Sequence, residues 1–291
     1  DVYKRQLLDQ ALSLLPRALV EADYGEAVAQ ILELDPLDKA GLRSQYLPLM
    51  VSKRRVDVQE AMKKQDWDGT ITRIDKIIAD LKPTGKLAAD MWVDRARAHK
   101  GLKQWDQAEA DYAQALTFTP DDADLRIERG RFFEQRSRPD KAVAEFTAAI
   151  GQKTKLVDRR RAAFARAPYQ KAYRQGLSKA FEVLAEVYRK VGRPADAAAM
   201  TLARAELWPG HPDQLYNAAC ELAQCVSLVG KDQALTAPDK EQRRRYADQA
   251  MELLRRAIFA GFDNIAHLKT DADLRALRGR ADYRDLLRRL E

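Results

Sequence analysis

The sequence has little glycine or proline, few cysteines and no long apolar run. Glycine occurs 13 times and proline 11 times among 291 residues, which disfavours an all-β chain, because such chains need many turns. Nowhere do about 18 apolar residues follow one another, so no membrane-spanning helix is predicted. The two cysteines, Cys220 and Cys225, lie five residues apart on an expected helix and so point to different faces, which disfavours a disulfide or a metal site.

Motifs of catalysis are also missing. Gly85-Lys86 is followed by Leu87 and lacks the earlier glycine of a phosphate-binding loop. The catalytic-loop and metal-loop motifs of protein kinases do not occur. The three histidines have no partner histidine or cysteine at the spacing of a metal site. We therefore expect a protein that is not an enzyme and that carries no cofactor and no metal.

Apolar and charged residues are both abundant in this sequence. Apolar residues make up 46% of the chain and charged residues 33%, which fits a helical protein with a large surface. The net charge is +7, from 51 basic and 44 acidic residues. An excess of this size favours an acidic partner only weakly and does not by itself indicate nucleic acid.

The stretch from residue 89 to 154 carries one pattern twice. Small residues recur at a fixed distance, because Ala96 to Gly130 and Ala108 to Ala142 are both 34 residues. An aromatic residue follows each second small residue by four positions, Tyr112 in the first copy and Phe146 in the second. A repeat of about 34 residues predicts stacked pairs of antiparallel helices, in which the small residues let the two helices approach closely.

This pattern resembles the tetratricopeptide repeat (TPR) family, and the resemblance is carried by Trp92, Ala96, Ala108, Tyr112 and Pro120. It implies an all-α fold, a right-handed α-solenoid of TPR-like helix pairs with C-terminal capping helices. Two features depart from the family pattern. Arg95 and Arg129 stand where leucine is expected, and His99 stands where an aromatic residue is expected. In the turns between the helices, Asp106 and Asp140 are predicted as N-caps of the helices that follow.

The spacing of the markers predicts an order of segments along the chain. The regions are a degenerate N-terminal helical repeat region (1–50), TPR-like repeats (51–156, as 51–84, 89–122 and 123–156), a basic irregular helical insert (157–177), TPR-like repeats with a long loop at 227–241 (178–259), and a C-terminal cap (260–291). In the first region the apolar markers run from Leu7 to Leu34. In the cap, Gly261 is predicted to end a helix in the left-handed conformation, and helices are predicted over 267–277 and 282–290.

The C-terminal half also resembles the TPR tails of planctomycete-type bacterial proteins that contain serine/threonine kinase or propeller domains. The runs Leu207-Trp208-Pro209-Gly210 and Leu215-Tyr216-Asn217-Ala218-Ala219 carry this likeness. It implies a bacterial protein-interaction scaffold that is part of a larger protein, or a regulatory or substrate-recruiting tail of such a kinase. Because the first residue is Asp1 and not methionine, we expect the chain to begin within a longer protein. A cytoplasmic location is expected.

A groove for a partner is predicted on the first helix of each pair. The residues expected to face it are Val93, Arg97, Lys100, Ile127, Arg131, Glu134, Glu182, Glu186, Arg189 and Tyr216. Arg97, Lys100 and Arg131 are expected to cluster and to hold an acidic peptide or a C-terminal carboxylate. The alternative is a solvated charged face.

The basic insert suggests a second binding surface. Arg159, Arg160 and Arg161 form a candidate patch for an anionic partner. Nucleic acid is the less favoured partner there, because few aromatic residues are available to stack on bases.

Overall fold

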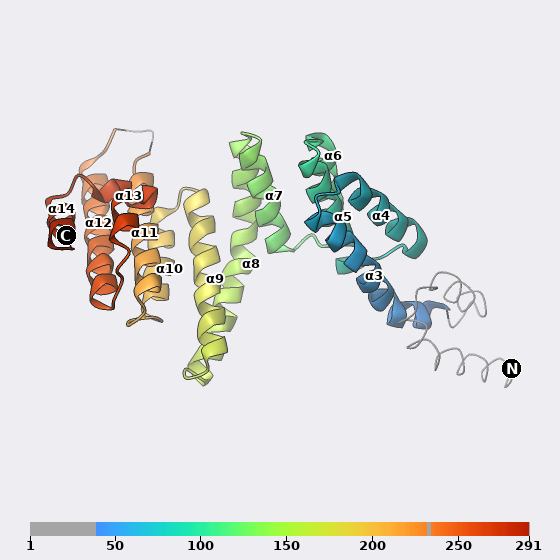
Figure 1. Cartoon of the computed structure of the whole chain (residues 1–291), viewed down its shortest axis with the longest axis horizontal. Helices are drawn as coiled ribbons and strands as arrows, with labels where there is room; N and C mark the ends of the chain where they lie inside the picture. Colours follow the sequence, from blue (N-terminus) through green and yellow to red (C-terminus); the bar gives the residue numbers. More distant parts are fainter. Residues whose placement is uncertain (1–38, 232–233, 291) are drawn as a thin grey trace. The chain divides into compact units, whose positions relative to one another are not determined.

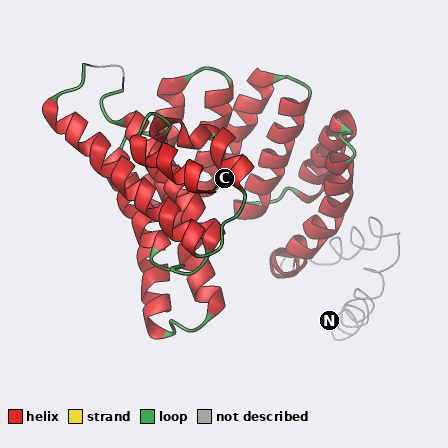
Figure 2. Cartoon of the chain, turned by 60° about the vertical axis from the view of Figure 1, so that its left-hand side comes forward, coloured by secondary structure: helices red, strands yellow, loops and turns green. Residues whose placement is uncertain are grey.

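The computed structural model describes residues 39–231 and 234–290, and no strand occurs in these ranges (Figures 1 and 2). The predicted all-α class is therefore confirmed. The predicted markers Leu7 to Leu34 lie outside the described residues.

The helices are α3 (Lys39–Lys63), α4 (Trp67–Leu81), α5 (Gly85–Gly101), α6 (Trp105–Phe118), α7 (Ala123–Gln135), α8 (Pro139–Arg166), α9 (Lys171–Lys190), α10 (Pro194–Ala205), α11 (Pro212–Leu228), α12 (Ala237–Phe259), α13 (Ile265–Thr270), the 3₁₀ helix η1 (Ala272–Leu277) and α14 (Ala281–Leu290). Among them none is long and apolar enough to cross a bilayer.

The chain divides into two compact units, Asp1–Pro120 (unit 1) and Asp121–Glu291 (unit 2), and each is described by itself. In the described part of unit 1, α3 packs on α4, α4 on α5 and α5 on α6. In unit 2 each helix from α7 to α12 packs on the next one, and η1 packs on α11. Each unit is thus built from consecutive antiparallel helix pairs, as the repeat predicts.

The turn inside each of the four helix pairs from α3–α4 to α9–α10 contains a residue in the left-handed region. These residues are Gln65, Lys103, Ser137 and Gly192, with φ of 57°, 61°, 54° and 71°. Lys103 to Ser137 is again 34 residues, so the turn conformation repeats with the sequence period. Only one of the four is glycine, although glycine adopts this conformation at the lowest cost.

The small residues of the repeat lie where the helices meet. Ala96 and Ala108 are fully buried, Ala142 is 2% exposed, and a Cβ placed on Gly130 would lie 2.7 Å from the ring of Phe146. Tyr112 and Phe146 are themselves buried. A larger side chain at the small positions would force the paired helices apart, because helices pack at axial distances of roughly 8–10 Å.

Two predictions about helix ends are wrong. Asp106 and Asp140 lie in the first turns of α6 and α8, whose N-caps are Gln104 and Arg138. Their carboxylates can still interact favourably with the helix dipole there. The helix predicted over 267–277 is interrupted at Asp271, whose side chain accepts a hydrogen bond from the backbone N–H of Asp273 and so starts η1. Gly261 has φ of 104°, as predicted for the end of α12.

The segment predicted as an irregular basic insert is regular over most of its length. Helix α8 continues to Arg166, a short turn follows, and α9 begins at Lys171. The surplus residues therefore lengthen two packed helices. The loop predicted at 227–241 is shorter in the structure than predicted. Helix α11 ends at Leu228, and a capping box between Thr236 and Asp239 starts α12 at Ala237.

Candidate functional site

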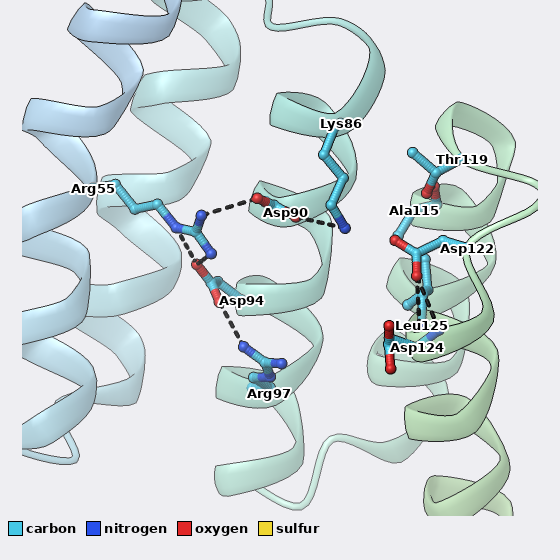
Figure 3. A network of polar contacts seen from close by, with 10 residues as sticks. All are labelled: Arg55, Lys86, Asp90, Asp94, Arg97, Ala115, Thr119, Asp122, Asp124 and Leu125. Carbon is cyan, nitrogen blue, oxygen red and sulfur yellow. Dashed lines mark hydrogen bonds and ion pairs between the residues drawn. The ribbon is translucent and has the colours of Figure 1, made fainter. Parts of the chain in front are cut away.

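The predicted groove residues of unit 1, Val93, Arg97 and Lys100, lie on α5, and Arg97 belongs to a charged network (Figure 3). The carboxylate of Asp94 is fully buried and contacts the guanidinium of Arg55 at 2.8 Å and that of Arg97 at 3.0 Å. Arg55 also contacts Asp90 at 3.0 Å. Burial raises the pKa of Asp94 above its ordinary value, although both arginines oppose this shift. Arg97, whose side chain is 39% exposed, is therefore already paired with Asp94, and Val93 is buried.

In unit 2 the predicted groove residues bind one another across neighbouring helices. Arg131 on α7 donates two hydrogen bonds of 2.8 Å to the carboxylate of Glu186 on α9. Lys190 on α9 contacts Glu134 on α7 at 2.9 Å. The base lies on α7 in the first ion pair and on α9 in the second. Both ion pairs join α7 and α9, which are the first helices of two successive helix pairs. A carboxylate ligand at Arg131 would have to compete with Glu186.

A pocket of about 470 Å³ opens in unit 2 between the helix pairs and the C-terminal cap. Three of the predicted groove residues line it, Glu182, Arg189 and Tyr216. The full lining is Glu182, Arg189, Arg204, Gln214, Tyr216, Asn217, Cys220, Glu221, Gln224, His267, Asp271 and Asp273. Ile127, by contrast, is buried on α7 and is not part of this lining.

One wall of the pocket holds two arginines around one glutamate. Arg204 on α10 is 4% exposed and donates a hydrogen bond of 2.7 Å to Glu221 on α11. Thr201 donates to the other oxygen of Glu221 at 2.8 Å, and Arg189 lies 3.7 Å from it. Nη1 of Arg189 and Nε of Arg204 are buried without a hydrogen-bond partner among the described residues. Two guanidinium groups share one carboxylate, so this wall keeps a positive charge.

The opposite wall is centred on the carboxylate of Asp271. It accepts a hydrogen bond of 2.6 Å from the hydroxyl of Tyr216, one of 2.9 Å from the backbone N–H of Asp273, and a weak one from the Cys220 thiol at 3.5 Å. His267 lies 3.4 Å away. Burial favours the neutral acid, but these hydrogen bonds outweigh it and lower the pKa of Asp271 below 3.8. The carboxylate is thus ionised and already bound by protein donors.

The chemistry of the pocket favours binding over nucleophilic catalysis. Burial raises the pKa of the Cys220 thiol, and the nearby Asp271 raises it further, so the thiol stays protonated. Burial raises the pKa of the Tyr216 hydroxyl as well. Within residues 39–231 and 234–290, no three His, Cys, Asp or Glu side chains are placed to hold a metal ion. Both cysteines are free and buried.

Sequence reasoning missed Arg204, Glu221 and Asp271. The first of these had a usable signal, because Arg204 follows Ala197 and Thr201 at helical spacing on a face that is otherwise small and buried. An arginine on such a face needs a partner. Asp271 could not be found in this way, because it reaches Tyr216 only through the folding of the cap onto α11.

The predicted anionic-partner patch lies away from the pocket, on the last turns of α8. Arg159, Arg160 and Arg161 are all exposed. Arg161 contacts Asp158 at 3.7 Å. The side chain of Arg160 lies against α9 at Gly176.

No family model matches the sequence, and no curated protein matches it. Solved structures with a similar arrangement include a MamA protein at 14% identity and a TM-score of 0.44, covering 72% of this chain and 94% of that one. BtubC from P. vanneervenii has 14% identity, a TM-score of 0.45 and coverage of 88% and 93%. YrrB, described as a TPR protein with an unusual peptide-binding site, has 15% identity, a TM-score of 0.39 and coverage of 70% and 87%. Because these TM-scores lie below 0.5, the description of the fold rests on the helices of this chain.

Proposed function

We propose that the chain is a non-catalytic protein-interaction scaffold and that the pocket of unit 2 receives an acidic group of a partner polypeptide. The observation that carries the proposal is the wall formed by Arg189 and Arg204, two guanidinium groups that share the single carboxylate of Glu221 beside an open volume of about 470 Å³. Glutamate, aspartate and a C-terminal carboxylate all present oxygens that guanidinium groups bind with charge-assisted hydrogen bonds.

The acidic residues of the pocket do not oppose this assignment. Glu221 is already bound by Arg204 and Thr201, and Asp271 by Tyr216 and the cap backbone. Glu182 contacts Lys179 at 2.7 Å. Three of the four acidic side chains in the lining are thus compensated locally, and Asp273 is the fourth. The arginine wall is the part of the pocket that attracts an anion.

The test is a selection of random peptides on the full chain, followed by affinity measurements with Arg189→Gln. We expect the selected peptides to share an acidic side chain or a free C-terminus. The variant should weaken their binding about 10-fold or more, because a hydrogen bond to a charged group contributes roughly 1.5–3 kcal/mol.

The matched control is Arg193→Gln, which removes the same charge from an exposed arginine that pairs with Asp196 and does not line the pocket. It should leave the affinity unchanged. Equal binding by wild type and Arg189→Gln, with circular dichroism showing both folded, would refute the proposal.

A further inference from the structure

The net charge of this protein is concentrated at one end of one helix hairpin. Residues 155–174 contain seven basic residues and one acidic residue, a net charge of +6, whereas the whole chain of 291 residues has +7. The basic residues are Lys155, Arg159, Arg160, Arg161, Arg166, Lys171 and Arg174. We call this segment, the end of α8 with the start of α9, the basic tip. The remaining 271 residues are nearly balanced in charge.

The basic tip extends beyond the rest of unit 2. In Figures 1 and 2 the turn between α8 and α9 reaches past the ends of α10, α11 and α12. The turn carries Tyr169, whose side chain is 95% exposed, and Tyr173 on the first turn of α9 is 38% exposed. The tip is therefore convex, and it presents charge and two amphipathic rings outward.

Much of the charge of the tip has no acidic counterpart. Lys155, Arg159, Arg166 and Lys171 are exposed, and none has an acidic side chain within 4.0 Å in the part of the chain that the structure describes. Lys155, Arg159 and Arg166 are spaced by four and seven residues and so share one face of α8. Other arginines of the described chain have acidic partners, as Arg95 has Asp111 at 2.8 Å and Arg131 has Glu186 at 2.8 Å. The tip thus combines a concentration of positive charge with few acidic partners.

We propose that the basic tip docks on the surface of an anionic lipid bilayer. A protruding end with charge on its outer face can meet a flat anionic surface, where lysine and arginine near the headgroups are attracted electrostatically. The exposed ring of Tyr169 suits the headgroup region, because tyrosine has an apolar body and a polar end. A single-stranded nucleic acid would need a groove lined with stacking rings, which a convex tip with two tyrosines does not offer.

The test is cosedimentation of the full chain with vesicles of phosphatidylcholine, with and without phosphatidylserine. We expect binding only to the vesicles that contain phosphatidylserine, and weaker binding as the salt concentration rises. The variant Lys155→Gln, Arg159→Gln, Arg166→Gln should lower the partition coefficient on the order of 100-fold, since each basic residue near an anionic surface contributes roughly a fivefold factor. These side chains are exposed, so the fold should survive.

A matched control removes three charges outside the tip. Lys231, Lys240 and Arg244 are exposed on unit 2, and the triple change of these residues to glutamine should leave vesicle binding nearly unchanged. Equal losses in the two triple variants would overturn the proposal, because they would show a response to net charge alone. Binding to a DNA duplex or to a polyglutamate peptide without binding to the anionic vesicles would overturn it as well.

Discussion

At the scale of single residues, the arginines that depart from the repeat pattern are explained by partners with the same spacing. Arg95 binds Asp111, and Arg129 contacts Glu145 at 3.3 Å. Arg95 to Arg129 and Asp111 to Glu145 are both 34 residues, so an ion pair recurs in place of an apolar contact. The arginine departures were visible in the sequence. Their acidic partners could also be found in the sequence. Asp111 directly precedes Tyr112, and Glu145 directly precedes Phe146, on the second helix of each pair.

Asp271 is the residue whose ionisation ties the cap to α11, and it predicts a dependence of stability on pH. Its pKa in the folded state lies below 3.8, held there by hydrogen bonds that outweigh burial. A lowered folded pKa makes the carboxylate stabilising above the unfolded pKa, and this contribution is lost as the pH falls through the folded value. The difference in unfolding free energy between wild type and Asp271→Asn should be largest above about pH 5 and should shrink below about pH 4.

The measurement is urea unfolding of the wild type and Asp271→Asn at a series of pH values. Tyr216→Phe is the informative companion, because it removes the 2.6 Å hydrogen bond and keeps the ring against Phe262. It should move the Asp271 titration, followed by the carboxyl carbon shift, to higher pH. A difference between wild type and Asp271→Asn that does not vary with pH would contradict this account.

At the scale of helices, the sequence predicted the pairs well and the ends of helices poorly. The pairs were predictable because Ala96, Ala108, Gly130 and Ala142 recur at a spacing set by close helix contact. The length of α8 was harder to predict, because six of its twelve residues after Thr154 are charged. In the structure Ile150, Val157 and Phe164, spaced by seven residues, pack in the core of unit 2 and continue the helix. The pocket was predicted only in part, since four of its twelve lining residues come from α10 and the cap, where no groove residue was predicted.

Replacing glycine by alanine should have opposite effects on the free energy of unfolding at Gly130 and at Gly151. Gly130→Ala places a Cβ 2.7 Å from the buried ring of Phe146, and overpacking of this kind should cost about 1–3 kcal/mol of unfolding free energy. Gly151→Ala on α8 meets nothing within 4 Å. It should stabilise the protein by about 0.5–1 kcal/mol, because alanine favours a helix over glycine. Urea unfolding of both variants checks the signs, and a stabilising Gly130→Ala would refute the proposed contact.

At the scale of the whole molecule, each of the two units has its own apolar core. In unit 2 it runs through α8 to α12 and the cap, from Val157 to Tyr283. In unit 1 it includes Val58, Ile74 and Met91. Because a repeat array is stabilised by contacts between neighbouring pairs, such a unit can hold its structure without distant parts of the chain.

We therefore predict that residues 121–291 fold when expressed alone. Helix α6 ends at Phe118 and α7 begins at Ala123, so a start at Asp121 cuts no helix. Asp122 then still caps α7 by accepting hydrogen bonds of 3.0 Å from the backbone N–H groups of Asp124 and Leu125 (Figure 3). The fragment should give a helical circular dichroism spectrum and one cooperative urea transition. Gly130→Ala should shift that transition as it does in the full chain, because Gly130 and the Phe146 ring that it contacts both lie in unit 2. A fragment that is unfolded, or insensitive to Gly130→Ala, would show that its stability depends on residues before Asp121.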